Sequence, residues 1–161
     1  MIALKIVDVK KFMEKLLVSP MFDHFYVFSA DIKVSVTWHL DGSINKDYYS
    51  SDELEIMNDR TYILWSEVKH HIFNMIKGKR TPSNLKIVFM LANEPLQKYA
   101  ENLNLAYEHI SALFLNIKFD HSGLTIITGA SQKTFSLDRA LEQEWDQTLK
   151  QFLQTNDIEF E

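Results

Sequence analysis

The 161-residue chain has a formal net charge of −5, with 46% hydrophobic residues, 24% charged residues and no cysteine. The proportions of hydrophobic and charged residues are typical of a folded domain. The absence of cysteine excludes disulfides and thiolate chemistry, and the negative net charge argues against nucleic-acid binding by global electrostatics. No apolar run approaches the ~20 residues of a membrane-spanning helix, so we expect a cytoplasmic protein without a membrane partner.

The first half of the chain alternates between strand and helix patterns. Apolar spacing predicts a strand, a helix capped by Asp8, two strands and a returning strand, over residues 2–7, 9–18, 25–28, 32–40 and 44–49. In the fourth of these segments every second residue is apolar from Ile32 to Leu40, and Thr37 and His39 fall on the polar face. Asp41-Gly42 predicts the turn before the returning strand.

The second half is expected to contain helices over residues 50–57, 62–77, 93–103 and 136–153, and strands over 85–92 and 157–161. The strand over 85–92 is so apolar that we expect both of its faces to be buried. The stretch from Ser111 to Asp138 predicts strand, tight turn, strand, short link and a third strand before the last helix begins.

These elements predict an α+β fold in which antiparallel strands pack one face against helices. Residues 1–49 and 85–137 share a β-α-β-β(-β) order, which indicates an internal repeat inside a single domain spanning residues 1–161. The helix over 62–77 and the C-terminal helix are additional to this repeat. A single-sheet α+β sandwich is the alternative arrangement.

Five segments, MIALKIVDVKKFMEKLL, IKGKRTP, LFLNIKFD, TGASQKTFSLD and IEFE, and the helix with Trp145-Asp146 together resemble an uncharacterised bacterial family of unknown function. The resemblance implies no activity, cofactor or site residue. The repeated unit also resembles, in architecture, one domain of a sliding DNA clamp, which implies a clamp-like fold but not clamp function. The helix over 93–103 departs from a DNA-facing clamp helix because Glu94 and Glu101 offset Lys98.

The histidines suggest either a metal site or an enzyme. Glu67 and His71 have the i, i+4 spacing of shared ligands, but His70 should diverge from His71 and no third ligand motif accompanies them. We therefore expect no bound metal, no cofactor and no catalytic residue. The alternative is an enzyme in which His39 or His71 works with nearby carboxylates, among them Asp41.

Four basic residues, Lys77, Lys79, Arg80 and Lys86, form the clearest electrostatic feature. Cations at a helix C-terminus commonly only complement the helix dipole. The functional interpretation is an anion contact, or weak and salt-sensitive nucleic-acid binding, which Lys10, Lys11 and Lys15 would extend if they share that side.

The four glycines leave no phosphate-cradling loop, and neither G-x-G-x-x-G nor G-x-S-x-G is present. The sequence thus favours a non-enzymatic cytoplasmic binding or scaffold module that acts through protein contacts. An enzyme with an unrecognised His/carboxylate site and a weak nucleic-acid or anion binder are the alternatives.

Overall fold

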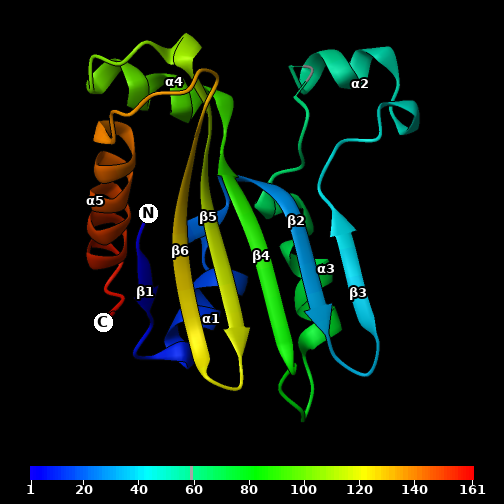
Figure 1. The fold of residues 1–161 in the computed structure, drawn as a ribbon. Helices are drawn as coiled ribbons and strands as arrows, with labels where there is room; N and C mark the ends of the chain where they lie inside the picture. The colour runs from blue at the N-terminus through cyan, green and yellow to red at the C-terminus, as the bar shows by residue number, and fades with distance from the viewer. Residues whose placement is uncertain (59) are drawn as a thin grey trace.

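The structure is a computed structural model that describes residues 1–58 and 60–161. Its strands lie in one antiparallel sheet of order β1-β6-β5-β4-β2-β3 (Figure 1). The strands are β1 (Ala3–Lys5), β2 (Phe25–Lys33), β3 (Thr37–Asp41), β4 (Asn84–Leu91), β5 (Ile110–Asp120) and β6 (Gly123–Gln132). The fold is therefore α+β with an open antiparallel sheet, as the sequence predicts.

The α-helices among the described residues are α1 (Val9–Leu17), α2 (Ser51–Ile56), α3 (Trp65–Ile76), α4 (Asn93–Asn102) and α5 (Ala140–Thr155). Short 3₁₀ turns lie at Pro20–Phe22 (η1), Lys46–Tyr48 (η2) and Tyr107–His109 (η3). Side chains start several of these elements, as when the Asp8 carboxylate accepts the Lys11 N–H at 3.0 Å. Ser50 and Glu53 form a capping box at α2.

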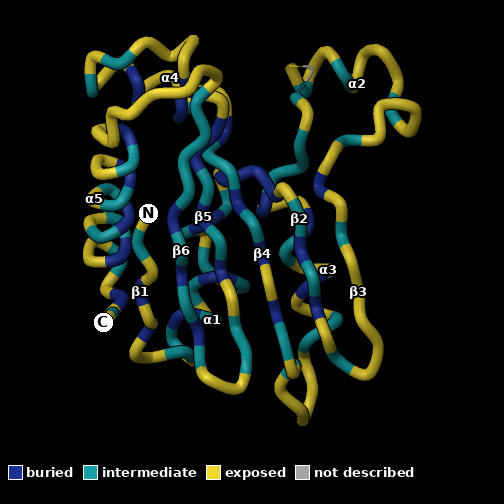
Figure 2. Tube along the Cα trace, in the orientation of Figure 1, coloured by how far each residue is buried: buried dark blue, intermediate teal, exposed yellow. Residues whose placement is uncertain are grey.

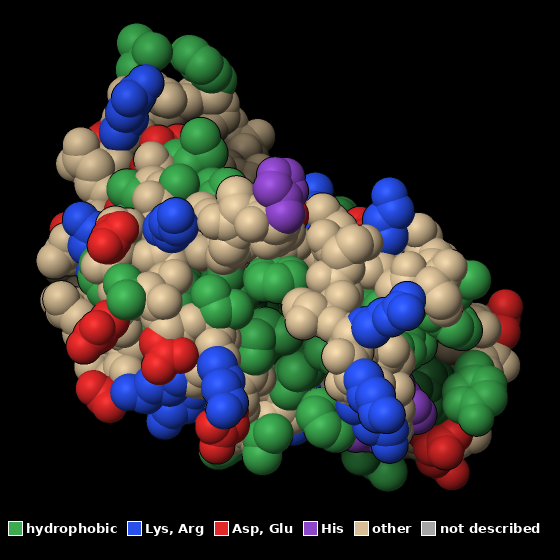
Figure 3. Space-filling model, turned by 90° about the horizontal axis from the view of Figure 1, so that it is seen from below, with side chains coloured by type: hydrophobic (Ala, Val, Ile, Leu, Met, Phe, Trp, Pro, Cys, Tyr) green, Lys and Arg blue, Asp and Glu red, His purple; other side chains and the backbone are tan. Residues whose placement is uncertain are grey.

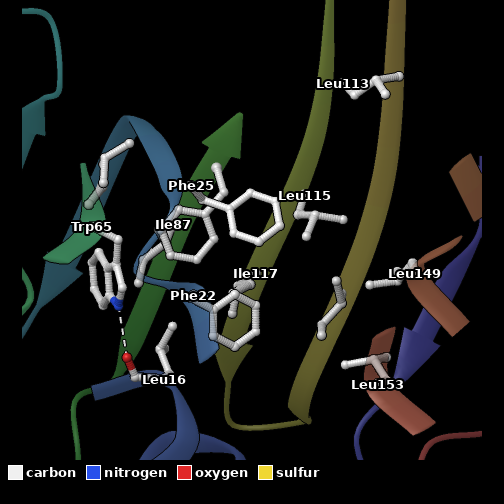
Figure 4. Close-up of a cluster of buried hydrophobic side chains, with 14 of the residues drawn as sticks. Leu16, Phe22, Phe25, Trp65, Ile87, Leu113, Leu115, Ile117, Leu149 and Leu153 are labelled. Atoms are coloured by element: carbon white, nitrogen blue, oxygen red, sulfur yellow. Dashed lines mark hydrogen bonds between the residues drawn. The ribbon is translucent and has the colours of Figure 1, made fainter. Parts of the chain in front are cut away.

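Helices cover one face of the sheet. In Figure 1, α1 and α3 lie behind the strands, α5 runs along the β1–β6 side and α4 lies at the upper end. Figure 4 shows the covered face, where Ile87, Leu115 and Ile117 point toward Phe22, Phe25 and Trp65. The Trp65 indole N–H donates to the Leu16 carbonyl at 2.8 Å, which ties α3 to α1 inside this core.

Phe22 is the centre of the core. It is fully buried and its ring lies 5.5 Å from that of Phe89 on β4 and 5.5 Å from that of Phe152 on α5. Its ring also lies 5.7 Å from Phe12 on α1 and 6.0 Å from Phe25 on β2. One aromatic side chain thus joins two helices to two strands from different halves of the chain.

Three predicted strands are not observed as such: two lie between residues 32 and 49, and the third lies after β6. Residues 32–40 do not form one strand, because a hairpin turn at 34–36 divides β2 from β3. The alternation survives because Ile32 and Trp38 are cross-strand partners and so share a face. The returning strand over 44–49 is instead η2, with a single bridge between Ser43 and Tyr62. Residues 111–138, all of which the structure describes, contain β5 and β6 but not the predicted third strand, because β6 itself extends to Gln132.

Two further expectations also need correction. The strand over 85–92 is buried on one face only, since Lys86 is exposed and Val88 half-buried while Leu85, Ile87 and Phe89 are buried. The tail over 157–161 is not a full strand but a single bridge from Phe160 to Ile6, next to two 2.9 Å hydrogen bonds between Lys5 and Glu161.

The chain runs twice through a β-α-β-β order, as β1-α1-β2-β3 and β4-α4-β5-β6. Both runs contribute strands to the same sheet, in which β1 of the first lies beside β6 of the second. The internal repeat, the single domain and the clamp-like resemblance stay predictions.

Gly42 tests the packing where the chain leaves β3. A β-carbon at this position would lie 1.7 Å from the Val27 carbonyl oxygen, a backbone atom that cannot rotate away. We expect Gly42→Ala to destabilise the fold by about 1–3 kcal/mol or more. The control is Gly129→Ala, whose new β-carbon would make an ordinary 3.5 Å contact with Phe114 and should change stability by no more than about 1 kcal/mol. Urea unfolding of both variants measures the difference, and equal stabilities would show that the β2–β3 approach is looser than described.

Candidate binding surface

The face of the sheet opposite the helices has no helix over it among the described residues (Figure 1). Side chains alternate along each strand, so the residues between the core positions point to this uncovered face. On β4 these are Asn84, Lys86, Val88 and Met90. Figure 2 shows the resulting alternation, in which buried segments are interrupted by half-buried and exposed ones along the central strands. We refer to this side as the uncovered face.

One row of side chains crosses all six strands on the uncovered face. The registers place neighbours opposite one another from β3 to β1, in the order His39, Asp31, Lys86, Lys118, Thr125 and Lys5. Three of the six are lysines and one is an acid. We call this set the lysine row.

The lysine row contains an unfavourable pair. Lys86 and Lys118 are directly opposite on β4 and β5, and like charges in that position destabilise a sheet. Asp31 lies opposite Lys86 but also contacts His39, whose Nδ1 is 2.5 Å from the Asp31 Oδ1. Lys118 has only a 3.8 Å approach to Asp120. The central lysines are therefore incompletely neutralised, and a negative group placed over them would be stabilised.

An apolar patch lies beside the lysine row, farther along the same strands. Val88, Met90, Phe114 and Ile127 are half-buried there, and Phe28 is 42% exposed. Phe28 is forced outward by the bulge between Val27 and Ser29 on β2. Its ring lies 5.9 Å from Phe114, edge to face, and 5.6 Å from Tyr62. We call these residues the apolar patch.

A surface hollow of about 520 Å³ lies at the lower end of the sheet. Its polar lining comes from the β2–β3 hairpin, the start of β4 and the β5–β6 turn, and consists of Asp31, Lys33, Thr37, Ser83, Asn84, Asp120 and His121. In the turn, the Ser122 hydroxyl and backbone N–H both donate to Asp120 and hold the pKa of that carboxyl below its ordinary value. Asp120 therefore stays ionised near Lys118 at neutral pH.

The four basic residues singled out from the sequence are not all in one place. Lys77, Lys79 and Arg80 are exposed in the loop that joins α3 to β4, and Lys86 lies on the uncovered face itself. Figure 3, which views the molecule from below, shows Lys and Arg side chains spread over this side among Asp and Glu side chains. Lys11 does not extend the cluster, because it pairs with Asp157 at 2.6 Å on the helix side.

The structure brings His39 to the Asp31 carboxylate and His70 to His71. His39 shares the uncovered face with Thr37, as expected, but no hydrogen bond joins it to a hydroxyl within residues 1–58 and 60–161. His70 and His71 do not diverge, since their ring centroids are 3.9 Å apart. Glu67 is engaged by Arg60, and the described residues contain no group of three or more ligands placed to hold a metal ion.

Lys118 and Lys5 were missed by reasoning from sequence. Lys5 is the only charge in β1 and Lys118 is one of two in the mainly apolar β5, and in isolation such a residue indicates only a solvent-facing position. Their significance comes from the strand order, which brings residues 86 and 118 directly opposite each other.

Comparison with known proteins places this chain in a family. A family model, described as a family of unknown function (DUF5721), matches residues 15–161. The chain belongs to DUF5721. No curated protein and no solved structure matches it significantly. Among the described residues of this DUF5721 protein, no helix combines the length and apolarity needed to span a membrane.

The lysine pair gives a test of the surface in this DUF5721 protein. We expect Lys118→Gln to stabilise the fold by about 0.2–1 kcal/mol at low ionic strength, because it removes the repulsion from Lys86. The gain should shrink as salt screens the charges. Lys33→Gln is the matched control, since Lys33 faces Thr37 and Asn84 rather than another lysine.

Urea unfolding at two salt concentrations measures both variants. Loss of stability in Lys118→Gln at low salt would contradict the reading of the lysine pair as uncompensated charge.

Proposed function

We propose that this DUF5721 protein is a non-enzymatic binding module of the cytoplasm that holds a protein partner against the uncovered face. The observation that supports this is the combination of the lysine row with the apolar patch on a sheet face without helices. An absence of cysteine is compatible with a reducing compartment. The proposed partner presents acidic side chains beside apolar ones, because that surface complements both parts of the face.

The patch resembles a binding surface in its mixture of groups. Aromatic and methionine side chains, here Phe28, Phe114 and Met90, are enriched at the centres of protein interfaces. Charged groups at the rim steer association and choose the partner more than they set its affinity. The lysine row at the edge of the apolar patch fits that division of roles.

Weak binding of a nucleic acid or another anion is a second candidate. It is favoured by the opposition of Lys86 and Lys118 and by the exposed loop with Lys77, Lys79 and Arg80. The acidic net charge of −5 works against it, because binding through a few lysines falls steeply with salt.

Affinity capture with matched variants tests the proposal. The immobilised protein, incubated with extract of its source cells, is expected to retain a protein that the double variant Lys86→Glu/Lys118→Glu loses. The control Lys10→Glu/Lys15→Glu carries the same change of charge on α1, on the covered side, and should retain it.

Circular dichroism establishes that each variant is folded. Equal retention by all three proteins, or no retained protein at all, would contradict a partner on the uncovered face. If nuclease removes the retained material and added salt releases it, the result would favour nucleic-acid binding, the second candidate, over a protein partner.

A further inference from the structure

The two edges of the sheet are treated differently by the chain. At the β1 edge the C-terminal tail supplies backbone partners, with two 2.9 Å hydrogen bonds between Lys5 and Glu161 and one of 3.1 Å from Val7 N–H to the Glu159 carbonyl. At the β3 edge no segment of the described chain pairs with the outer side of Thr37–Asp41. β3 is thus an open edge strand.

The backbone groups that point outward on β3 follow from the hairpin. Val34 N–H donates to the Val36 carbonyl at 3.0 Å, and Gly42 N–H donates to the Phe28 carbonyl at 3.1 Å. Backbone groups alternate in direction along a strand, so those of Trp38 and Leu40 also face β2. The N–H and C=O groups of Thr37, His39 and Asp41 therefore face away from the sheet, and an extended backbone is the partner that matches their spacing.

β3 has little of the protection that edge strands usually carry. It contains neither lysine nor proline. Trp38 is 47% exposed, and Val36 in the adjoining turn is 55% exposed. A strand with free backbone groups and exposed large apolar side chains is a template for pairing with another strand.

We propose that β3 pairs antiparallel with β3 of a second copy of this chain, about a two-fold axis at His39. This register uses all five residues of β3 and makes hydrogen-bonded pairs of the outward-facing positions Thr37, His39 and Asp41. It is self-complementary on both faces. On the uncovered face, the Thr37 hydroxyl of each copy lies opposite the Asp41 carboxylate of the other, and on the covered side Trp38 lies opposite Leu40.

The arm over residues 42–58 and 60–64 adds to the contact. In an antiparallel pair the chain that leaves Asp41 of one copy lies beside the turn that precedes Thr37 of the other. Figure 1 shows the arm with α2 extending beyond the end of β3. The arm carries two large apolar side chains left in solvent, Tyr48 at 80% and Ile56 at 81% exposed, which the turn of the second copy with Val36 would meet.

The contact made by the two strands alone is small. The surface buried by five paired residues falls short of the roughly 1,200–2,000 Å² that a stable interface buries, so the arm contact is needed. We expect a weak dimer, with a Kd of the order of micromolar. The axis stands perpendicular to the sheet, so the two uncovered faces become neighbours on one side. This pairing shares His39 with the lysine row but does not use Lys86, Lys118 or the apolar patch, so either proposal can fail while the other stands.

Cysteine cross-linking tests the register directly, because the natural chain contains no cysteine. His39→Cys places two thiols on residues about 5.5 Å apart between Cα atoms, within the range of a disulfide. Thr37→Cys alone leaves its thiols about 13 Å apart along the strands, and so does Asp41→Cys alone. Under mild oxidation at about 100 µM protein, well above the expected Kd, we expect disulfide dimers from His39→Cys and from an equal mixture of the other two variants. Neither of those variants alone should give them.

Sedimentation velocity of the unmodified chain and two lysine variants provides the second measurement. His39→Lys keeps a partner for Asp31 within each copy but sets two ammonium groups opposite each other, and it should weaken dimerisation by about tenfold or more. Ala3→Lys adds an ammonium group at an exposed position of β1, at the other end of the sheet, and should leave dimerisation unchanged. A monomer at all concentrations, or cross-linking that is equal at all three positions, would overturn the proposal.

Discussion

The packing of Phe22 against both helices and strands is the interaction on which the rest of the structure depends. Its fully buried ring contacts aromatic side chains from α1, β2, β4 and α5, and Trp65 adds a hydrogen bond between α3 and the end of α1. Phe22, Phe25, Trp65 and Leu16 lie on the same face of the sheet (Figure 4). Because the helices are gathered there, the opposite face has no helix over it among the described residues, and its side chains come from the strands, with Tyr62 beside Phe28.

This one-sided arrangement explains where the surface features lie. The uncovered face retains the lysine row, in which Lys86 and Lys118 repel each other, beside half-buried aromatic and aliphatic groups. A helix packed on this face would have covered both the lysine row and the apolar patch. The tail pairs with the sheet edge at β1, whereas no described segment pairs with the outer side of β3. Membership of DUF5721 adds no function, so the proposals depend on this geometry.

Much of the secondary structure is predictable because it depends on local periodicity. The stripe through Val68 and Ile72 predicts α3, and the alternation after Ser111 predicts β5. The hairpin at 34–36 is not predictable in this way, since its valines have the preferences of a strand and no glycine or asparagine indicates a turn. Only part of the candidate surface was predictable. Lys86 stood out in the sequence by its charge, whereas its position directly opposite Lys118 depends on strand order and register.

The central claim is that one sheet face is open to solvent and the other is sealed by helices. Thiol-labelling rates of the single-cysteine variants Val88→Cys and Ile87→Cys, adjacent residues on β4 that point to opposite faces, test it most directly. The account predicts rapid labelling at position 88 and labelling at position 87 only at the rate of unfolding. Equal protection at both positions under conditions where the protein is monomeric would contradict it, because a segment of the chain would then cover the second face as well.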